Sequence, residues 1–394
     1  MLNMSPREPH VAPPPATRAR APLKMPARRI EEFDALRGIA IIWVICLHAY
    51  FGPWGTTPRA ELLTMRLTQL VANSSVPIFL FMSGFLSARD HSPNFSTLLT
   101  ARLRRLAIPL LFWMTVALLY QVWRTGALTG DLVQSFLLFD ISGQYYYVVV
   151  LLFLTAALYP LRFVDDRDLK WYVVAAFALN VATILYYRDR PLDALGWTLA
   201  YRNPLMWVFS FTFGLWVART QGHVRFSRRI IAAAAIGMVA STAVYVYLGE
   251  RGPGYPESYF GVTVFLFAVF GFIVWPAAIR AVERNRGGHA LLAPFRALAP
   301  LAFAIYLVHK PLFVGELSGR VTASGLLSGG GIGNDFLGLV GSIFVVGATA
   351  SIITVIVVNR LFPRFSAVYL GVEQPRRPGS HERTEPQAGD RPAA

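Results

Sequence analysis

The chain alternates between long apolar runs and short polar connections. About ten such runs are present, each of roughly 16 to 23 residues, and about 20 apolar residues suffice to cross a bilayer as a helix. The expected spans are residues 34–51, 67–87, 106–123, 144–161, 171–187, 203–218, 230–248, 259–279, 298–317 and 336–358. The pattern predicts an all-α fold: a polytopic membrane helix bundle with about ten transmembrane helices.

The basic residues alternate in step with these spans. Most of the 37 lysines and arginines fall in the two terminal tails and in the connections after the second, fourth, sixth and eighth spans. Positive charge is enriched in cytoplasmic loops, so this distribution places both termini in the cytoplasm and requires an even number of spans. The same loops explain the formal net charge of +15, which on a soluble protein would suggest nucleic-acid binding. We expect a lipid bilayer as a partner and no nucleic acid.

The composition supports a membrane protein with polar tails. Of the 394 residues, 55% are hydrophobic and 15% are charged, whereas soluble domains have about 25% charged residues. The one cysteine, Cys46, cannot form a disulfide within the chain. Residues 1–29 and 369–394 are rich in Pro, Gly, Ala and charge, which is typical of disorder. We therefore expect a disordered basic cytoplasmic tail over 1–29, a transmembrane domain over 30–368 and a second disordered cytoplasmic tail over 369–394.

Two ionisable residues in the first span are the leading candidates for chemistry. Such groups are costly within a membrane and are functional candidates by default. Arg37 and His48 are 11 residues apart, which places them on one helix face about 16 Å apart along the axis. One interpretation puts both in one internal cavity, where Arg37 holds an anion and His48 takes a proton from a hydroxyl. In the other, Arg37 pairs with Asp34 and reaches lipid phosphates, and His48 bonds a neighbouring helix.

The residues around this pair resemble a known family. The stretch FDALRGIA from Phe33 to Ala40, followed by His48, is similar to the opening signature of acyltransferase family 3, whose hallmark is an Arg and a His separated by ten residues in the first span. Later segments are similar in the same order: VPIFLFMSGFL at 76–86, RLRRLAIP at 102–109 and IYLVHKPL at 305–312. The resemblance covers about residues 30–365. It implies a membrane-bound O-acyltransferase of bacterial surface glycans and related acceptors, in the bacterial cytoplasmic (inner) membrane.

The resemblance also assigns roles to individual residues. Arg37 and His48 become catalytic, with His48 as the general base or as a transient carrier of the acyl group. Arg102 and Arg105 become candidates for binding the phosphates of acyl-CoA, although basic residues at a cytoplasmic helix end also set topology and bind lipid headgroups. Tyr146 lies in a tyrosine run where family members carry a Trp-containing pair.

Further candidates lie on the acceptor side or support the site. Asp34, Tyr146 and His309 are placed in this group. His309 shares a helix face with Glu316, which can alternatively pair with Arg320 four residues on. The neighbouring Lys310 is a charge inside a span, to which the sequence assigns no role.

The expected reaction moves an acyl group, with acetyl as the expected case, from acyl-CoA to a hydroxyl of a glycan, glycolipid or secondary metabolite. Acyl-CoA is a donor substrate, and we expect no permanently bound cofactor and no metal, since the histidines show no metal-ligand spacing. The alternative is a multi-pass transporter or flippase of a glycan or lipid-linked substrate, with an intramembrane histidine as proton relay. A scaffold is disfavoured because it gains nothing from costly intramembrane charges.

Overall fold

The computed structural model describes the greater part of the chain and is helical throughout. The described ranges are residues 30–49, 59–90, 92, 94–188, 190–249, 259–323 and 336–372. Residues 1–29 and all but the first four residues of 369–394, where disordered tails are expected, lie outside them.

The described chain folds into helices that follow the apolar runs. The α-helices are α1 Glu31–Ala49, α2 Arg59–Asn73, α3 Ser75–Ala88, α4 Phe95–Arg102, α5 Ile108–Thr125, α6 Gly130–Leu137, α7 Tyr146–Ala157, α8 Asp166–Arg188, α9 Ala194–Arg202, α10 Val208–Gln221, α11 Arg228–Gly249, α12 Val262–Glu283, α13 Arg286–Leu298, α14 Ala302–Val308, α15 Gly315–Ala323, α16 Phe336–Leu361 and α17 Pro363–Tyr369. Short 3₁₀ turns join several of them, at Gly143–Tyr145, Tyr159–Phe163, Pro204–Met206 and Ala299–Leu301. Two π-helical segments are Leu103–Ala107 and His309–Val314.

Seven helical stretches of the described chain are long and apolar enough to cross a membrane. They are Leu62–Ala88, Phe95–Thr125, Asp166–Arg188, Arg228–Gly249, Val262–Glu283, Arg286–Arg320 and Leu337–Leu361. Each matches one of the ten expected spans. The other three expected spans correspond to α1, which has three acidic residues in its first turn, and to α7 and α10, which have 12 and 14 residues. The total of about ten is therefore not established by length and apolarity alone.

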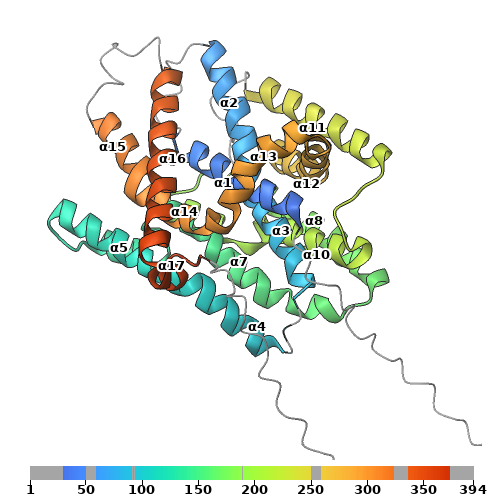
Figure 1. Ribbon diagram of the computed structural model, residues 1–394, viewed down its shortest axis with the longest axis horizontal. Coiled ribbons are helices and arrows are strands. Elements are labelled where there is room, and N and C mark those ends of the chain that lie inside the picture. The colour runs from blue at the N-terminus through green and yellow to red at the C-terminus, as the bar shows by residue number, and fades with distance from the viewer. Residues whose placement is uncertain are drawn as a thin grey trace, which may run out of the picture.

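Helix α1 forms the centre of the bundle (Figure 1). It packs against α2, α3, α12, α13, α14 and α16. Its closest approach is at Gly38, where an added Cβ would lie 1.9 Å from the backbone oxygen of Phe295 on α13. Only a glycine permits that contact, so the residue after Arg37 fixes how deeply α1 sits among its neighbours.

Helices α3 and α10 pack closely along their length. A Cβ at Gly84 would lie 2.0 Å from the Phe211 oxygen, and a Cβ at Gly214 would lie 2.0 Å from the Phe81 oxygen. The two glycines thus let the backbones touch at their crossing point, as small residues do between membrane helices. Gly84 is part of the expected second-span motif, and this packing explains its presence there.

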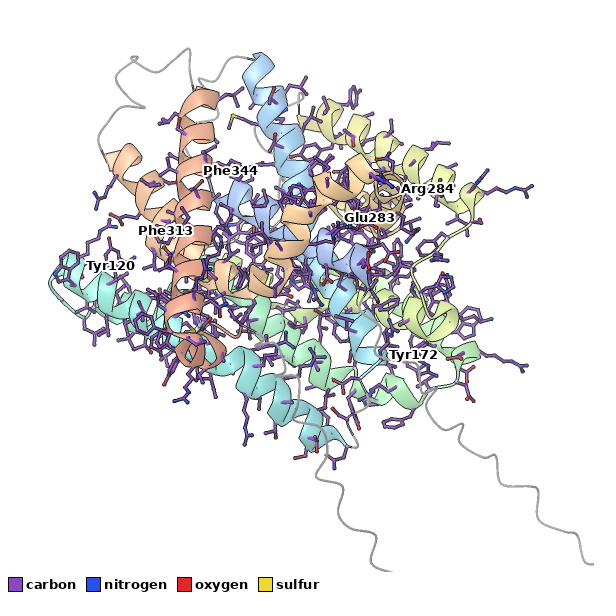
Figure 2. The ribbon with its side chains drawn as sticks, in the orientation of Figure 1. Tyr120, Tyr172, Glu283, Arg284, Phe313 and Phe344 are labelled. Atoms are coloured by element: carbon purple, nitrogen blue, oxygen red, sulfur yellow. The ribbon has the colours of Figure 1, made fainter. Side chains whose placement is uncertain are left out.

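The flanks of the bundle are apolar and outward-facing. On α5, Leu119 and Trp123 are exposed, and on α11 so are Ile236 and Val239. These helices lie on opposite flanks in Figure 1, and Figure 2 shows Tyr120 of α5 at the outer edge. Apolar side chains directed outward along whole helices are suited to lipid and not to water.

Hydrogen bonds and an ion pair link several loops and helix ends of the bundle. At one end, the Arg162 side chain donates to the Asp90 backbone oxygen, and Arg219 donates to the Arg162 oxygen at 2.9 Å. Glu32 at the start of α1 lies 3.6 Å from Arg280 near the end of α12. These bonds join the connections after α3, α7, α10 and α12, which are the connections expected to be cytoplasmic. We call this the basic end.

Candidate functional site

Helix α1 joins two cavities that adjoin inside the bundle. Arg37 lines a cavity of about 540 Å³, which we call the basic cavity. His48 lines a second cavity of about 440 Å³, which we call the aromatic cavity. Val44, Val76 and Tyr306 line both and form the boundary between them. Arg37 and His48 thus line two adjoining cavities, which meet at these three side chains along α1.

The basic cavity opens among residues of the basic end. Its wall includes the four arginines Arg37, Arg89, Arg102 and Arg105, and the two acids Asp34 and Asp90. Positive charge is in excess, so the cavity is suited to a ligand with several negative charges. The cavity brings together four residues that the sequence singled out: Asp34, Arg37, Arg102 and Arg105.

Two of these arginines lie within ion-pairing distance of the two acids. Arg37 Nη1 lies 3.9 Å from Asp34 Oδ1, the pairing at i, i+3 that the sequence allowed. Arg102 Nη2 lies 3.6 Å from Asp90 Oδ2, and their side chains are 23% and 24% exposed. Neither distance is that of a tight hydrogen-bonded pair, which is about 2.7–2.9 Å.

Asp90 is anchored by hydrogen bonds within its own loop. Burial raises the pKa of its carboxyl, but hydrogen bonds from the Ser92 hydroxyl and backbone N–H, at 2.6 and 2.8 Å, and the charges of Arg102 and Arg162 outweigh that effect. The net result is a pKa below the ordinary value of 3.8. Asp90 is thus ionised at neutral pH and fixes the entrance of the cavity.

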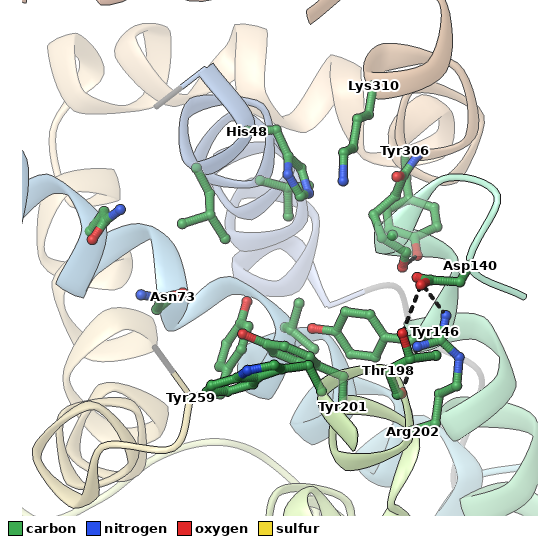
Figure 3. A pocket seen from close by; sticks show the side chains of 17 residues that line it. His48, Asn73, Asp140, Tyr146, Thr198, Tyr201, Arg202, Tyr259, Tyr306 and Lys310 are labelled. Atoms are coloured by element: carbon green, nitrogen blue, oxygen red, sulfur yellow. Dashed lines mark hydrogen bonds and ion pairs between the residues drawn. The ribbon is translucent and has the colours of Figure 1, made fainter. Parts of the chain in front are cut away.

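The aromatic cavity has a different wall. Five aromatic side chains face it, from Tyr146, Trp197, Tyr201, Tyr259 and Tyr306. Ring contacts link several of them, with centroids 5.5 Å apart for Tyr146 and Tyr201 and 6.0 Å apart for Tyr201 and Tyr259. Figure 3 shows Tyr146, Tyr201 and Tyr259 on the side of the cavity opposite His48. The amides of Gln69, Asn73 and Gln144 add hydrogen-bonding groups.

One acid and one arginine of this wall form a closed network. Asp140 Oδ1 accepts from Arg202 at 2.9 Å, and Asp140 Oδ2 accepts from the Thr198 hydroxyl at 2.8 Å (Figure 3). Arg202 also donates to the backbone oxygens of Leu138, Phe139 and Thr198. The pair is held in place because Arg202 donates four hydrogen bonds and Asp140 accepts two.

His48 contacts a second histidine. The rings of His48 and His309 have centroids 5.3 Å apart, and His309 is 0% exposed. Nδ1 of His309 lies 2.9 Å from the Tyr306 backbone oxygen and 3.2 Å from that of Ile305, so it carries the proton and donates. Its Nε2 is then the basic nitrogen, and among the described residues it has no hydrogen-bond partner.

The local backbone explains how His309 reaches this position. Pro311 has no N–H, so the Leu307 carbonyl loses its helical partner and instead accepts from the Tyr145 hydroxyl at 3.0 Å. The chain widens here into the π-helical segment His309–Val314. Such segments are frequent at functional sites, since the extra residue redirects the side chains of the next turn. Similarly, Pro109 comes just after the segment Leu103–Ala107, which contains Arg105.

The acceptor-side candidates lie in three different places. Tyr146 lines the aromatic cavity, whereas Asp34 lines the basic one. His309 contacts His48 without lining either cavity. Glu316 accepts from Arg320 at 2.8 Å, the i, i+4 pairing that the sequence allowed for it.

Several wall residues carry no recognisable sequence signal. Trp197 and Tyr201 come from α9, and Tyr259 comes from the turn before α12. Arg202, the last residue of α9, pairs with Asp140 in the connection after α6. Lys310 also lines the aromatic cavity. It was visible as a charge within a span, but the spacing could not show where it points.

The fold and site define a multi-pass membrane protein with a basic cavity and a histidine-bearing cavity joined along one helix. A family model described as "Acyltransferase domain", that of acyltransferase family 3, matches residues 30–358. The chain belongs to this family. No curated protein and no solved structure matches it. The resemblance inferred from the first-span motif is thereby confirmed.

Proposed function

We propose that this protein is an O-acyltransferase that moves an acyl group, in the expected case acetyl, from acyl-CoA to a hydroxyl of a sugar-bearing acceptor. The observation that carries the proposal is the pair of adjoining cavities, with Arg37 in one and His48 in the other. CoA carries several phosphates, and arginine binds phosphate with two parallel hydrogen bonds. The basic cavity, with Arg102 and Arg105, therefore suits the donor.

The aromatic cavity suits the acceptor. The apolar face of a sugar ring fits against aromatic side chains such as Tyr201 and Trp197, and its hydroxyls match amide and carboxylate groups. The donor's acyl carbon would reach this cavity past Val44, Val76 and Tyr306. The two substrates thus approach from opposite sides and react beside His48.

The chemistry requires one base and positioning. His48 takes the proton of the acceptor hydroxyl as its oxygen attacks the thioester carbonyl. The tetrahedral intermediate then collapses, the carbon–sulfur bond breaks, and the CoA thiolate takes a proton from the His48 imidazolium. His309 acts as a positioning residue: its buried ring lies against that of His48, with centroids 5.3 Å apart, and restricts the orientation of the His48 ring.

The same proposal includes the membrane arrangement. We infer about ten spans, with α1, α7 and α10 added to the seven apolar stretches, and both termini in the cytoplasm of a bacterial inner membrane. The charged or short helices α1 and α10 are largely buried among other helices, so they need not meet the length and apolarity that lipid contact demands. The basic end, where the arginine-rich loops contact one another, supports a single cytoplasmic face.

The test is transfer of label from radiolabelled acetyl-CoA in membranes that contain the protein. Substituting His48→Ala should lower transfer about 100- to 1,000-fold, because general bases contribute about that much. His223→Ala, at an exposed position beyond α10, is the matched control and should leave transfer unchanged. Both variants must reach the membrane in equal amounts.

Two results would contradict the proposal. Wild-type rates in the His48→Ala variant would exclude His48 as the base. Movement of a glycan across vesicle membranes without any acylation would instead favour a transporter, which leaves its cargo chemically unchanged.

A further inference from the structure

Lys310 places a second cationic group in the aromatic cavity, next to the proposed base. It is the second residue of the π-helical segment His309–Val314, and its side chain points into the cavity beside His48 (Figure 3). Its Nζ lies 3.2 Å from the position a Cβ would take at Gly143. The absence of a side chain at Gly143 therefore leaves the space that the ammonium group occupies.

The charges of the cavity wall do not balance. The wall contains Arg202 and Lys310 as cations and Asp140 as its one acid. Asp140 already accepts from Arg202 and Thr198, one on each carboxylate oxygen. Asp140 attracts the Lys310 ammonium at longer range, but no carboxylate of the described chain lies within ion-pairing distance of it.

A cation without a close partner in a membrane interior is costly, and such groups typically serve a ligand or a transport path. Lys310 lines the aromatic cavity and does not line the basic cavity. It thus lies on the acceptor's side of the boundary formed by Val44, Val76 and Tyr306, away from the phosphates of the donor. An anion that meets it should belong to the acceptor.

Resting on the function proposed above, we propose that the acceptor carries an oxyanion, a carboxylate or a phosphate, that pairs with Lys310 while a hydroxyl of the same molecule reaches His48. The aromatic rings and amides hold the sugar, and Lys310 selects for its charge. Uncharged sugars of the same shape fit the cavity but leave the ammonium unpaired, so they bind less tightly.

Binding to the purified full-length protein in detergent tests this without acyl-CoA. The probes are methyl β-glucuronide, glucose 1-phosphate and the neutral methyl β-glucoside, measured by isothermal titration calorimetry. At least one charged probe should bind at least tenfold more tightly than the neutral one. Lys310→Met should remove that preference and leave binding of the neutral probe unchanged, and Lys310→Arg should keep part of it. The ranking of the two charged probes distinguishes carboxylate from phosphate.

Two further variants separate a binding role from a general loss of structure. Lys170→Met, at an exposed position on α8, makes the same substitution away from the cavity and should bind as wild type. Gly143→Ala keeps the charge but crowds Nζ, so it should weaken only the charged probes, by a few-fold. The Gly143→Ala result tests the proposal even if Lys310→Met does not fold.

Charged probes that bind no more tightly than the neutral one would overturn the proposal. So would a Lys310→Met variant that keeps the preference, or one that slows acetyl transfer to charged and neutral probes equally while binding both as before. Lys310 would then stabilise the reacting carbonyl. Selective binding by a wild-type protein that transfers no acetyl group from acetyl-CoA would instead leave the anion site standing and reject the acyltransferase function.

Discussion

The basic cavity and the aromatic cavity share three wall residues but differ in how they can bind. The arginines of the basic cavity are partly exposed, and the pairs of Arg37 with Asp34 and Arg102 with Asp90 are 3.9 and 3.6 Å long. In the aromatic cavity, the pair of Arg202 with Asp140 is 2.9 Å long and both partners are further hydrogen-bonded. One wall is dominated by arginines, and the other by aromatic rings, amides and one hydrogen-bonded acid–arginine pair.

This difference fits two kinds of substrate. A group of arginines binds a common polyanion through charge, and its affinity falls with salt. A rigid wall of rings and amides discriminates by shape, because a poorly fitting ligand leaves buried polar groups unpaired. We therefore expect the kinetic constants for the donor to change when arginines are replaced. Those for the acceptor should change when aromatic rings are replaced. Substitutions in one cavity at a time can test that separation.

The largest effect beyond that of His48 is expected at Arg37. Substituting Arg37→Gln removes a charge from the basic cavity where it adjoins the boundary residues, and should lower kcat/KM for acetyl-CoA about 100-fold, since charge-assisted bonds to phosphate contribute about 2–3 kcal/mol. The KM for the acceptor should stay within twofold. Steady-state kinetics with each substrate varied in turn measures both, with Arg228→Gln at the exposed start of α11 as control. A change confined to the KM for the acceptor would contradict this prediction, because it would show that Arg37 binds the acceptor and not the donor.

A smaller effect, on the acceptor and not on the donor, is expected at Trp197. Trp197→Ala removes one ring of the aromatic wall and should raise the acceptor KM about tenfold, in line with about 1–1.5 kcal/mol for an aromatic contact, while the KM for acetyl-CoA stays the same. Trp197→Phe should retain most of the affinity. Trp171→Ala, at a 63% exposed position on α8, controls for the loss of a tryptophan. If the KM for the donor rose instead, the aromatic cavity would bind the donor, which contradicts the assignment proposed here.

The helical fold and one face of the site could be predicted from sequence patterns. Apolar runs predict the seven long stretches, and the 11-residue spacing predicts that Arg37 and His48 point in similar directions along α1. Both inferences use only helix geometry, which is local. Spans such as α1 and α10 are harder to delimit, because burial inside the bundle lets them carry charge or be short.

The aromatic cavity could not be predicted, since tertiary contacts create it. Trp197, Tyr201 and Tyr259 follow no apolar period, and they meet only because α9 and the turn before α12 converge on α7. The direction of Lys310 depends on the π-helical segment, where one extra residue per turn rotates the later side chains by about 100°. The division into two cavities likewise depends on the position of Tyr306, whose hydroxyl donates to the Gln144 backbone oxygen.

The smallest expected effect concerns the acid that anchors the entrance of the basic cavity. Because the pKa of Asp90 is lowered in the folded protein, its carboxylate stabilises the fold above the unfolded value of about 4, and this contribution is lost as pH falls through the folded pKa. Asp90→Asn should therefore lower the apparent melting temperature by a few degrees at pH 7, and the difference from wild type should shrink below about pH 4. Ser92→Ala removes one donor to Asp90 and should reproduce part of the effect. A difference that stays constant down to pH 3 would show that the Asp90 side chain stabilises the loop through its shape alone, and the charge contrast between the cavities would then rest on the arginines alone.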